Sequence, residues 1–166
     1  MITEADIAVL TDRCRDLPKT DNVHLATDFV SCLRDTVIDF QQHTTTVRRA
    51  IAHFNEYRWN ELRTLDDLQT LCDRYPDERS SNTELAEYLW GYKMWTRARM
   101  FRGLTDLFAS TGVRDLDSLR RWAEAGSFKA VVEGRVRGLG PTVYNWLVMR
   151  LGRRDRQAGR AHPSLR

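Results

Sequence analysis

The sequence predicts an all-α protein, a bundle of helices that ends in two short helices joined by a tight glycine turn. Apolar residues recur at intervals of three and four in one segment after another, which is the spacing of an amphipathic helix. No segment alternates convincingly between apolar and polar residues as a strand does, and no period repeats along the chain. With 166 residues, 42% of them hydrophobic, the chain is long enough for one domain with a substantial core.

The first helix is predicted within residues 1–20. Thr3 and Asp6 have the spacing of a capping pair, and Pro18 ends the segment. A second helix is predicted from about residue 25 to Phe40. Its apolar residues recur at helical spacing: Leu25, Ala26, Phe29, Val30, Leu33 and Val37.

The middle of the chain is predicted to hold three more helices. The polar, β-branched segment 40–46 separates the second helix from a third, whose inward residues are Val47, Ala50, Ile51 and Phe54. Thr64 caps a short fourth helix that Pro76 stops. The longest helix is predicted over residues 84–108, with a kink at Gly91.

Another helix precedes the end of the chain. Gly112 and Asp115 separate it from the long helix, and Gly126 follows it. Its helical spacing rests on Leu116, Leu119, Trp122 and Ala123. The domain is therefore predicted to run over residues 21–152, after the N-terminal helix and before a basic, disordered tail over residues 153–166.

The last part of this domain is predicted to fold as helix, glycine turn and helix. A short helix through Phe128, Val131 and Val132 ends at Gly134. Gly138 and Gly140 flank Leu139, and glycine permits a positive φ and the close approach of another backbone. Pro141 suits the first position of the second helix, whose outward N–H groups are those of Gly140, Thr142 and Val143. This pattern is compatible with an anion-binding turn and with an ordinary helix connection.

Positive charge is concentrated in the same region. Residues 127–166 contain nine Lys and Arg against Glu133 and Asp155, a net charge of +7. Because the whole chain carries +3, residues 1–126 carry −4. Such polarity is typical of a surface that faces a polyanion, whereas the cations from Arg153 onward are expected to form a solvated tail.

A second concentration of cations lies in the predicted long helix. Its members are Lys93, Arg97, Arg99 and Arg102, interleaved with Tyr88, Trp90, Tyr92 and Trp95. Basic and aromatic residues together suit nucleic acid, although a core helix with aromatic flanks is the preferred interpretation and a protein partner is the third.

No cofactor or metal site is predicted. Cys14, Cys32 and Cys72 are far apart and odd in number, which favours buried thiols in a reducing cytoplasm. The four histidines form no HExxH or Cys-His spacing, and no phosphate-loop or GxSxG pattern occurs. The sequence begins nothing like a signal peptide and has no apolar run of membrane-spanning length, so we expect a cytoplasmic protein without a membrane partner.

Four ordered segments resemble the helix-hairpin-helix (endonuclease III-like, HhH-GPD) DNA glycosylase superfamily. The first three are DTVIDFQQHTTTVRRAIAHF (residues 35–54), RTLDDLQTL (residues 63–71) and LWGYKMWTRARMFRGLTDLF (residues 89–108). The fourth is the Gly-Leu-Gly hairpin. The resemblance implies a helical fold that binds DNA and acts in DNA repair.

The resemblance also implies particular DNA contacts. In the family, a glutamine of the polar turn enters the gap that a flipped base leaves; Gln42 is the best match and Gln41 the next. The alternative is that these glutamines and His43 only solvate a helix break. The phosphate contacts that the resemblance implies involve Gly138, Leu139, Gly140, Thr142 and Val143, with Arg135, Arg137 and Lys129 adding positive charge.

Catalysis is where the sequence departs from the family. Thr142 stands where bifunctional members have a nucleophilic lysine, and a hydroxyl cannot form a Schiff base. Asp155 is the only acid after the turn and comes several residues earlier than the family's aspartate, so it is better explained as a surface charge. We therefore predict a DNA-binding domain without base-excision activity. The alternatives are an active glycosylase with a displaced acid and a helical protein-interaction module.

Overall fold

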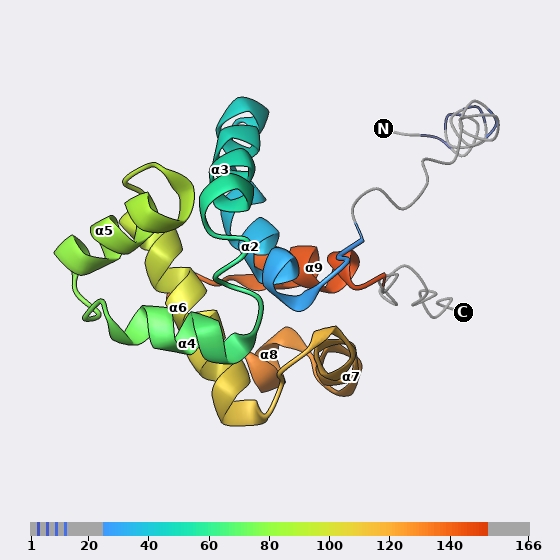
Figure 1. Cartoon of the computed structure of the whole chain (residues 1–166). Coiled ribbons are helices and arrows are strands. Elements are labelled where there is room, and N and C mark those ends of the chain that lie inside the picture. The colour runs from blue at the N-terminus through green and yellow to red at the C-terminus, as the bar shows by residue number, and fades with distance from the viewer. Residues whose placement is uncertain (1–2, 4–5, 7–8, 10–11, 13–24, 153–166) are drawn as a thin grey trace.

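The computed structural model describes Thr3, Asp6, Val9, Asp12 and residues 25–152, and every regular element in this part of the chain is a helix (Figure 1). The predicted all-α class is confirmed. Thr3 and Asp6 form the predicted capping pair: the Thr3 N–H donates to Asp6 Oδ2 at 2.9 Å, and the Asp6 N–H donates to Thr3 Oγ1 at 3.2 Å. The rest of the predicted first helix and the tail over residues 153–166 lie outside the described residues.

The helices of residues 25–152 follow one another in short connections. They are α2 (Phe29–Asp39), α3 (Thr44–Tyr57), α4 (Leu65–Asp73), α5 (Arg79–Trp90), α6 (Trp95–Thr111), α7 (Leu116–Ala125), α8 (Phe128–Val131) and α9 (Pro141–Arg150). No helix in this part of the chain is both long and apolar enough to cross a membrane.

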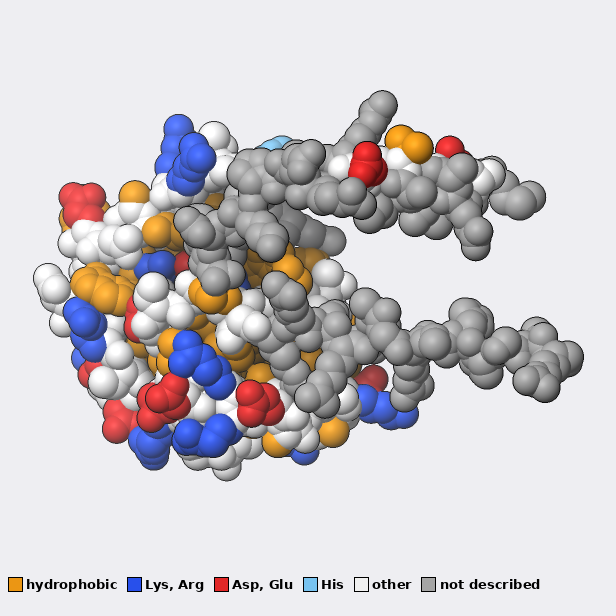
Figure 2. Space-filling view, turned by 90° about the vertical axis from the view of Figure 1, so that its right-hand side faces the viewer, with side chains coloured by type: hydrophobic (Ala, Val, Ile, Leu, Met, Phe, Trp, Pro, Cys, Tyr) orange, Lys and Arg blue, Asp and Glu red, His pale blue; other side chains and the backbone are white. Residues whose placement is uncertain are grey.

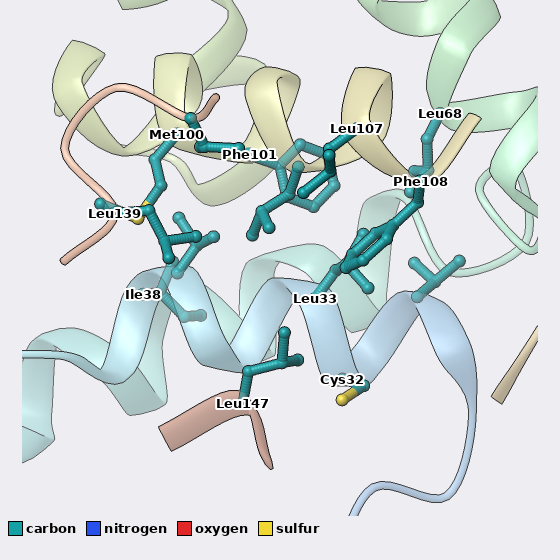
Figure 3. Packing of buried hydrophobic residues seen from close by; sticks show 14 of the residues in the cluster. Cys32, Leu33, Ile38, Leu68, Met100, Phe101, Leu107, Phe108, Leu139 and Leu147 are labelled. Carbon is teal, nitrogen blue, oxygen red and sulfur yellow. The ribbon is translucent and has the colours of Figure 1, made fainter. Parts of the chain in front are cut away.

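The helix α2 forms the centre of the fold. Nine of its eleven residues are buried, because α3, α6 and α9 all pack against it. Figure 3 shows Leu33 and Ile38 of α2 among side chains from α6 and from the last part of the chain, including Phe101 and Leu147. Asp28 fixes the start of α2 by accepting the Ser31 N–H at 2.8 Å. Its buried residues include Ser31, Arg34 and Thr36 as well as the apolar ones, so α2 is covered on more sides than an amphipathic surface helix is.

Two predicted helix starts are confirmed in atomic detail. Thr64 caps α4 by accepting the Asp67 N–H, and Asp67 Oδ2 accepts the Thr64 N–H in turn. Asp115 caps α7 in the same way, with Ser118 as its partner. These reciprocal pairs satisfy amide groups that have no acceptor within their own helix.

The long helix predicted over residues 84–108 is wrong. The structure has two helices there, α5 and α6, because Gly91 ends α5 in the left-handed conformation with φ +72° instead of kinking a continuous helix. A Cβ at Gly91 would lie 2.9 Å from His53 Nδ1, so α3 also requires glycine at this position. The break lets α6 turn back and pack against α5.

A chain of aromatic rings joins the central helix to the end of the domain. Phe29 contacts Phe108, Phe108 contacts Trp122, and Trp122 contacts Tyr144, with ring centroids 5.9, 5.1 and 6.1 Å apart. Phe128 of α8 lies 5.9 Å from Tyr144. Each pair is edge-on or tilted, the geometry that aromatic quadrupoles favour. The short helix α8 is therefore held by ring packing more than by its own four residues.

Arg150, near the end of α9, is buried against α2. Its Nη2 lies 2.7 Å from Asp39 Oδ2 and its Nη1 lies 3.5 Å from Asp35 Oδ2. The last described helix is therefore tied to the first one of the core by a buried cation between two carboxylates.

Arg150→Met should lower the free energy of unfolding by about 2–4 kcal/mol. The change keeps much of the side-chain volume but leaves Asp39 without its cation and Asp35 with Arg34 alone, which costs more than losing a surface pair. Urea denaturation followed by circular dichroism measures it. Arg120→Met is the matched control, because Arg120 pairs with Asp117 at 2.8 Å on the exposed surface, and we expect a loss below about 1 kcal/mol. Equal losses in both variants would contradict a structural role for the buried pair.

Candidate nucleic-acid interface

The hairpin turn alternates between buried apolar and exposed polar residues. Val132, Val136 and Leu139 are buried, whereas Arg135 and Arg137 between them are exposed. The helix before the turn is shorter than its sequence suggests, since α8 ends at Val131. The apolar residues therefore hold the turn from inside, and the two arginines project into solvent.

The inner side of this turn packs on α6. A Cβ at Gly103 would lie 2.9 Å from Val136 Cγ1, and a Cβ at Gly138 would lie 3.5 Å from Met100 Cε. Figure 3 shows Leu139 beside Met100 of α6 and close to Ile38 of α2. Glycine at position 103 thus lets the turn approach α6 more closely than any other residue would allow.

The outer side of the turn presents backbone amides. Gly138 has φ +82°, Gly140 is the N-cap of α9 with φ −91° and ψ 176°, and Pro141 occupies the predicted first position. The N–H groups of Gly140 and Thr142 donate to no backbone or side-chain acceptor among the described residues. The Leu139 N–H, by contrast, donates to the Val136 carbonyl at 3.3 Å, so Leu139 contributes to the inner side of the turn by both its side chain and its amide.

The remaining predicted hairpin residues differ in exposure. Lys129 and Thr142 are exposed, whereas the side chain of Val143 is buried beneath the start of α9. A ligand at this turn would therefore meet cationic side chains, backbone and the exposed ring of Pro141.

The polar turn between α2 and α3 contains a strained residue. Gln41 has φ +56°, the one positive φ outside glycine among the described residues, and its side chain is exposed. Gln42 is half-buried, and its N–H donates weakly to the Asp39 carbonyl at 3.4 Å. His43 is the N-cap of α3 without a side-chain cap bond. A non-glycine residue held in this conformation is a feature of functional turns as well as of tight connections.

Arg97 of α6 holds the polar turn from its buried side. Its guanidinium is buried, donates from Nη2 to the Phe40 carbonyl, and lies 5.7 Å from the centroid of the Phe40 ring. Burial lowers the pKa of Arg97 from its ordinary value, with Tyr92 acting in the opposite direction. The hydrogen bond fixes the position where α2 stops and Gln41 begins the turn.

Both turns are therefore carried by one short stretch of α6. Arg97, Met100 and Gly103 follow at intervals of three, so they lie near one another along one side of the helix. Their six-residue span corresponds to about 9 Å at 1.5 Å per residue. Both turns therefore contact α6 within a short distance along its axis.

The cations of residues 93–102 do not form the second basic surface that their sequence suggested. Arg97 is buried, and Arg102 donates to the carbonyls of Cys72 and Tyr75. Lys93 lies 3.7 Å from Glu87, and Arg99 stacks on Trp95 at 4.7 Å from its ring centroid. These cations stabilise backbone and ring contacts, so the preferred interpretation of a core helix with aromatic flanks is correct.

Burial makes the described thiols poor nucleophiles. Burial raises the pKa of Cys32 and of Cys72 to about 12, so both are protonated at neutral pH. Cys14 lies outside the described residues. Among the residues that the structure describes, no three His, Cys, Asp or Glu side chains gather as a metal site would require.

The weak catalytic candidate Asp155 lies outside the described residues, so the structure does not test it. Thr142, which stands where bifunctional family members have a lysine, is exposed at the start of α9. Three hollows of about 670, 490 and 350 Å³ are lined by residues of neither turn. None of these three could receive a base held between the two turns.

Comparison of the chain with protein-family models, with curated proteins and with solved structures found no match. The resemblance to the glycosylase superfamily therefore rests on the sequence segments alone.

Proposed function

We propose that this chain is a DNA-binding domain of the helix-hairpin-helix glycosylase type that holds duplex DNA by its phosphates and does not excise bases. The observation that carries the proposal is the two-sided hairpin turn. Its apolar residues are buried against α6, while Arg135, Arg137 and the amides of Gly140 and Thr142 face outward.

Such a surface suits a phosphate for two reasons. Amide groups without an acceptor at the start of a helix carry its positive partial charge, and a phosphate oxygen can accept from them. The exposed guanidinium groups add charge without requiring a particular base. The expected binding is therefore strong at low salt and weakly dependent on sequence.

The polar turn supports the same proposal. Gln41 is exposed in a strained conformation, and Arg97 holds that turn beside the stretch of α6 that carries the hairpin. A planar amide at this place can fill a gap in the base stack and bond to the base left opposite. Gln41 is the better placed of the two glutamines, since Gln42 is half-buried.

The purified chain should bind a 20-base-pair duplex with an affinity that falls steeply with salt. If Lys129, Arg135 and Arg137 each neutralise one phosphate, log K against log salt should have a slope of about −3 or steeper. Fluorescence anisotropy at several NaCl concentrations measures it. Absence of binding at low salt would favour the protein-interaction module.

Gly140→Val should abolish most of the DNA binding while the fold survives. No atom lies within 4 Å of a Cβ built at Gly140 and its φ is −91°, so valine fits the free protein but would obstruct a phosphate at the turn. Ser127→Val is the matched control: Ser127 is the exposed N-cap of α8, also extended and also without a side-chain cap bond. Equal affinity of the two variants would show that the hairpin is only structural.

The chain should release no base from duplexes that contain uracil, an alkylated purine or an oxidised purine. Thr142 cannot form the covalent intermediate, and the loss of a positioned carboxylate typically lowers a rate by orders of magnitude. Alkali treatment after incubation reveals abasic sites as strand breaks. Release that disappears in Asp155→Asn would instead establish an active glycosylase with a displaced acid.

A further inference from the structure

Three segments of the chain contain no acidic residue. They are residues 40–55, 88–105 and 134–152, together 53 residues. With 23 Asp and Glu in 166 residues, a set of this size would hold about seven at the average frequency of the chain. The other 113 residues therefore carry all of the negative charge.

The fold brings these three segments together. Arg97 of the second segment donates to the Phe40 carbonyl of the first, and His53 Nε2 lies 3.3 Å from the Tyr88 carbonyl. Met100 and Gly103 of the second segment lie against Gly138 and Val136 of the third. Segments that are distant in the sequence thus form one acid-free region, with α6 in its middle.

Of the five carboxylates that directly border the three segments, two are paired with a cation, whereas Glu56, Asp106 and Glu133 are exposed and have no ion pair with another described residue. Asp39, just before the first segment, binds Arg150, and Glu87, just before the second, pairs with Lys93. Figure 2 shows acidic and basic side chains lying close together along the lower edge of the molecule. Within the three acid-free segments, no carboxylate of the same segment weakens the positive electrostatic potential of an exposed cation.

Two such cations lie on the first half of α3. Arg48 and Arg49 are exposed and form no ion pair or hydrogen bond with another described residue. Val47, Ala50 and Phe54 form the buried side of α3, so Thr44, Thr45 and both arginines share its solvent face. These arginines follow directly after the polar turn.

No contact among the described residues explains why Arg48 and Arg49 lie near the start of α3. Cations near the start of a helix oppose its dipole, and α3 has no acid in its first turn to compensate. Two exposed arginines elsewhere in the described residues have acidic partners, Arg114 in Asp66 and Arg120 in Asp117, whereas others such as Arg63 and Arg74 have no ion pair. A polyanionic ligand would supply the missing partner for Arg48 and Arg49.

We propose that the solvent face of α3, through Arg48 and Arg49, is a second phosphate-binding arm for duplex DNA. The polar turn with Gln41 then lies between two arms, the hairpin on one side and α3 on the other. This inference rests on the proposed function and extends its DNA surface beyond the hairpin. The absence of acids in all three segments removes the repulsion that a duplex would otherwise meet between the arms.

The test is the salt dependence of duplex binding in paired serine variants. Arg48→Ser with Arg49→Ser should reduce the slope of log K against log NaCl by about 1.8, which is two phosphate contacts at about 0.9 each. Arg48→Lys with Arg49→Lys should retain the slope of the unchanged chain, because counterion release depends on charge. Circular dichroism confirms that each variant is folded.

The control is Arg63→Ser with Arg74→Ser, which removes the same charge from exposed positions on either side of α4, among Glu61, Asp66, Asp73 and Asp77. Its slope should equal that of the unchanged chain. If the slope after the Arg48 and Arg49 changes equals that of the control while Arg135→Ser with Arg137→Ser lowers it, the second arm is disproved and the hairpin proposal stands. If the unchanged chain binds no DNA at low salt, the proposed function fails, and the second arm fails with it.

Discussion

The buried cation of Arg150 is the constraint on which the placement of the hairpin depends. It joins the end of α9 to Asp35 and Asp39 of α2, across more than a hundred residues of sequence. The Ala26 N–H donates to the Arg150 carbonyl at 2.8 Å, so backbone and side chain both bind the same end of the helix. A purely apolar contact would allow α9 to slide or rotate on α2 at small cost, whereas charges removed from water are stable only in a narrow geometry. The direction of α9, and hence of the amides at its start, is therefore fixed by an ion pair at its opposite end.

The helix α6 fixes the position of the polar turn relative to the hairpin turn. Arg97 holds the chain where α2 stops, and Met100 and Gly103 hold the hairpin. Two turns separated by about a hundred residues thus share one rigid support, and their spacing follows from the helical rise. This explains why the cations of α6 point inward. A DNA surface made by α6 itself would need exposed side chains, whereas a support for two turns needs buried ones that satisfy carbonyl groups.

The sequence predicted the helical class, the cap at Thr64, the helix boundary at Asp115 and the turn before Pro141, because each of these depends on residues within one helical turn of one another. It did not predict that Gly91 ends a helix, since a glycine within an apolar helical pattern can either kink a helix or cap it, and the His53 side chain that crowds this position comes from α3. The same limit applies to Arg97 and Arg102. Their exposed or buried state depends on carbonyl groups of distant segments, and a run of basic residues in a helix looks the same in both cases. The positive φ of Gln41 could not be predicted from the sequence either. The absence of Asp and Glu from residues 40–55, by contrast, can be read directly from it.

The charge that favours a polyanion also bears on catalysis. A glycosylase needs a carboxylate close to the sugar it attacks, and that carboxylate must lie beside phosphates that repel it. In this chain the acid-free segments leave few carboxylates near the two turns. Asp39 is the nearest in sequence to the polar turn, but it accepts from Arg150 at 2.7 Å and helps to hold α9 in place. Recruiting it for chemistry would release the helix whose amides would hold the phosphate. Among the described residues, the carboxylate nearest in sequence to the polar turn is thus engaged in holding α9 against α2.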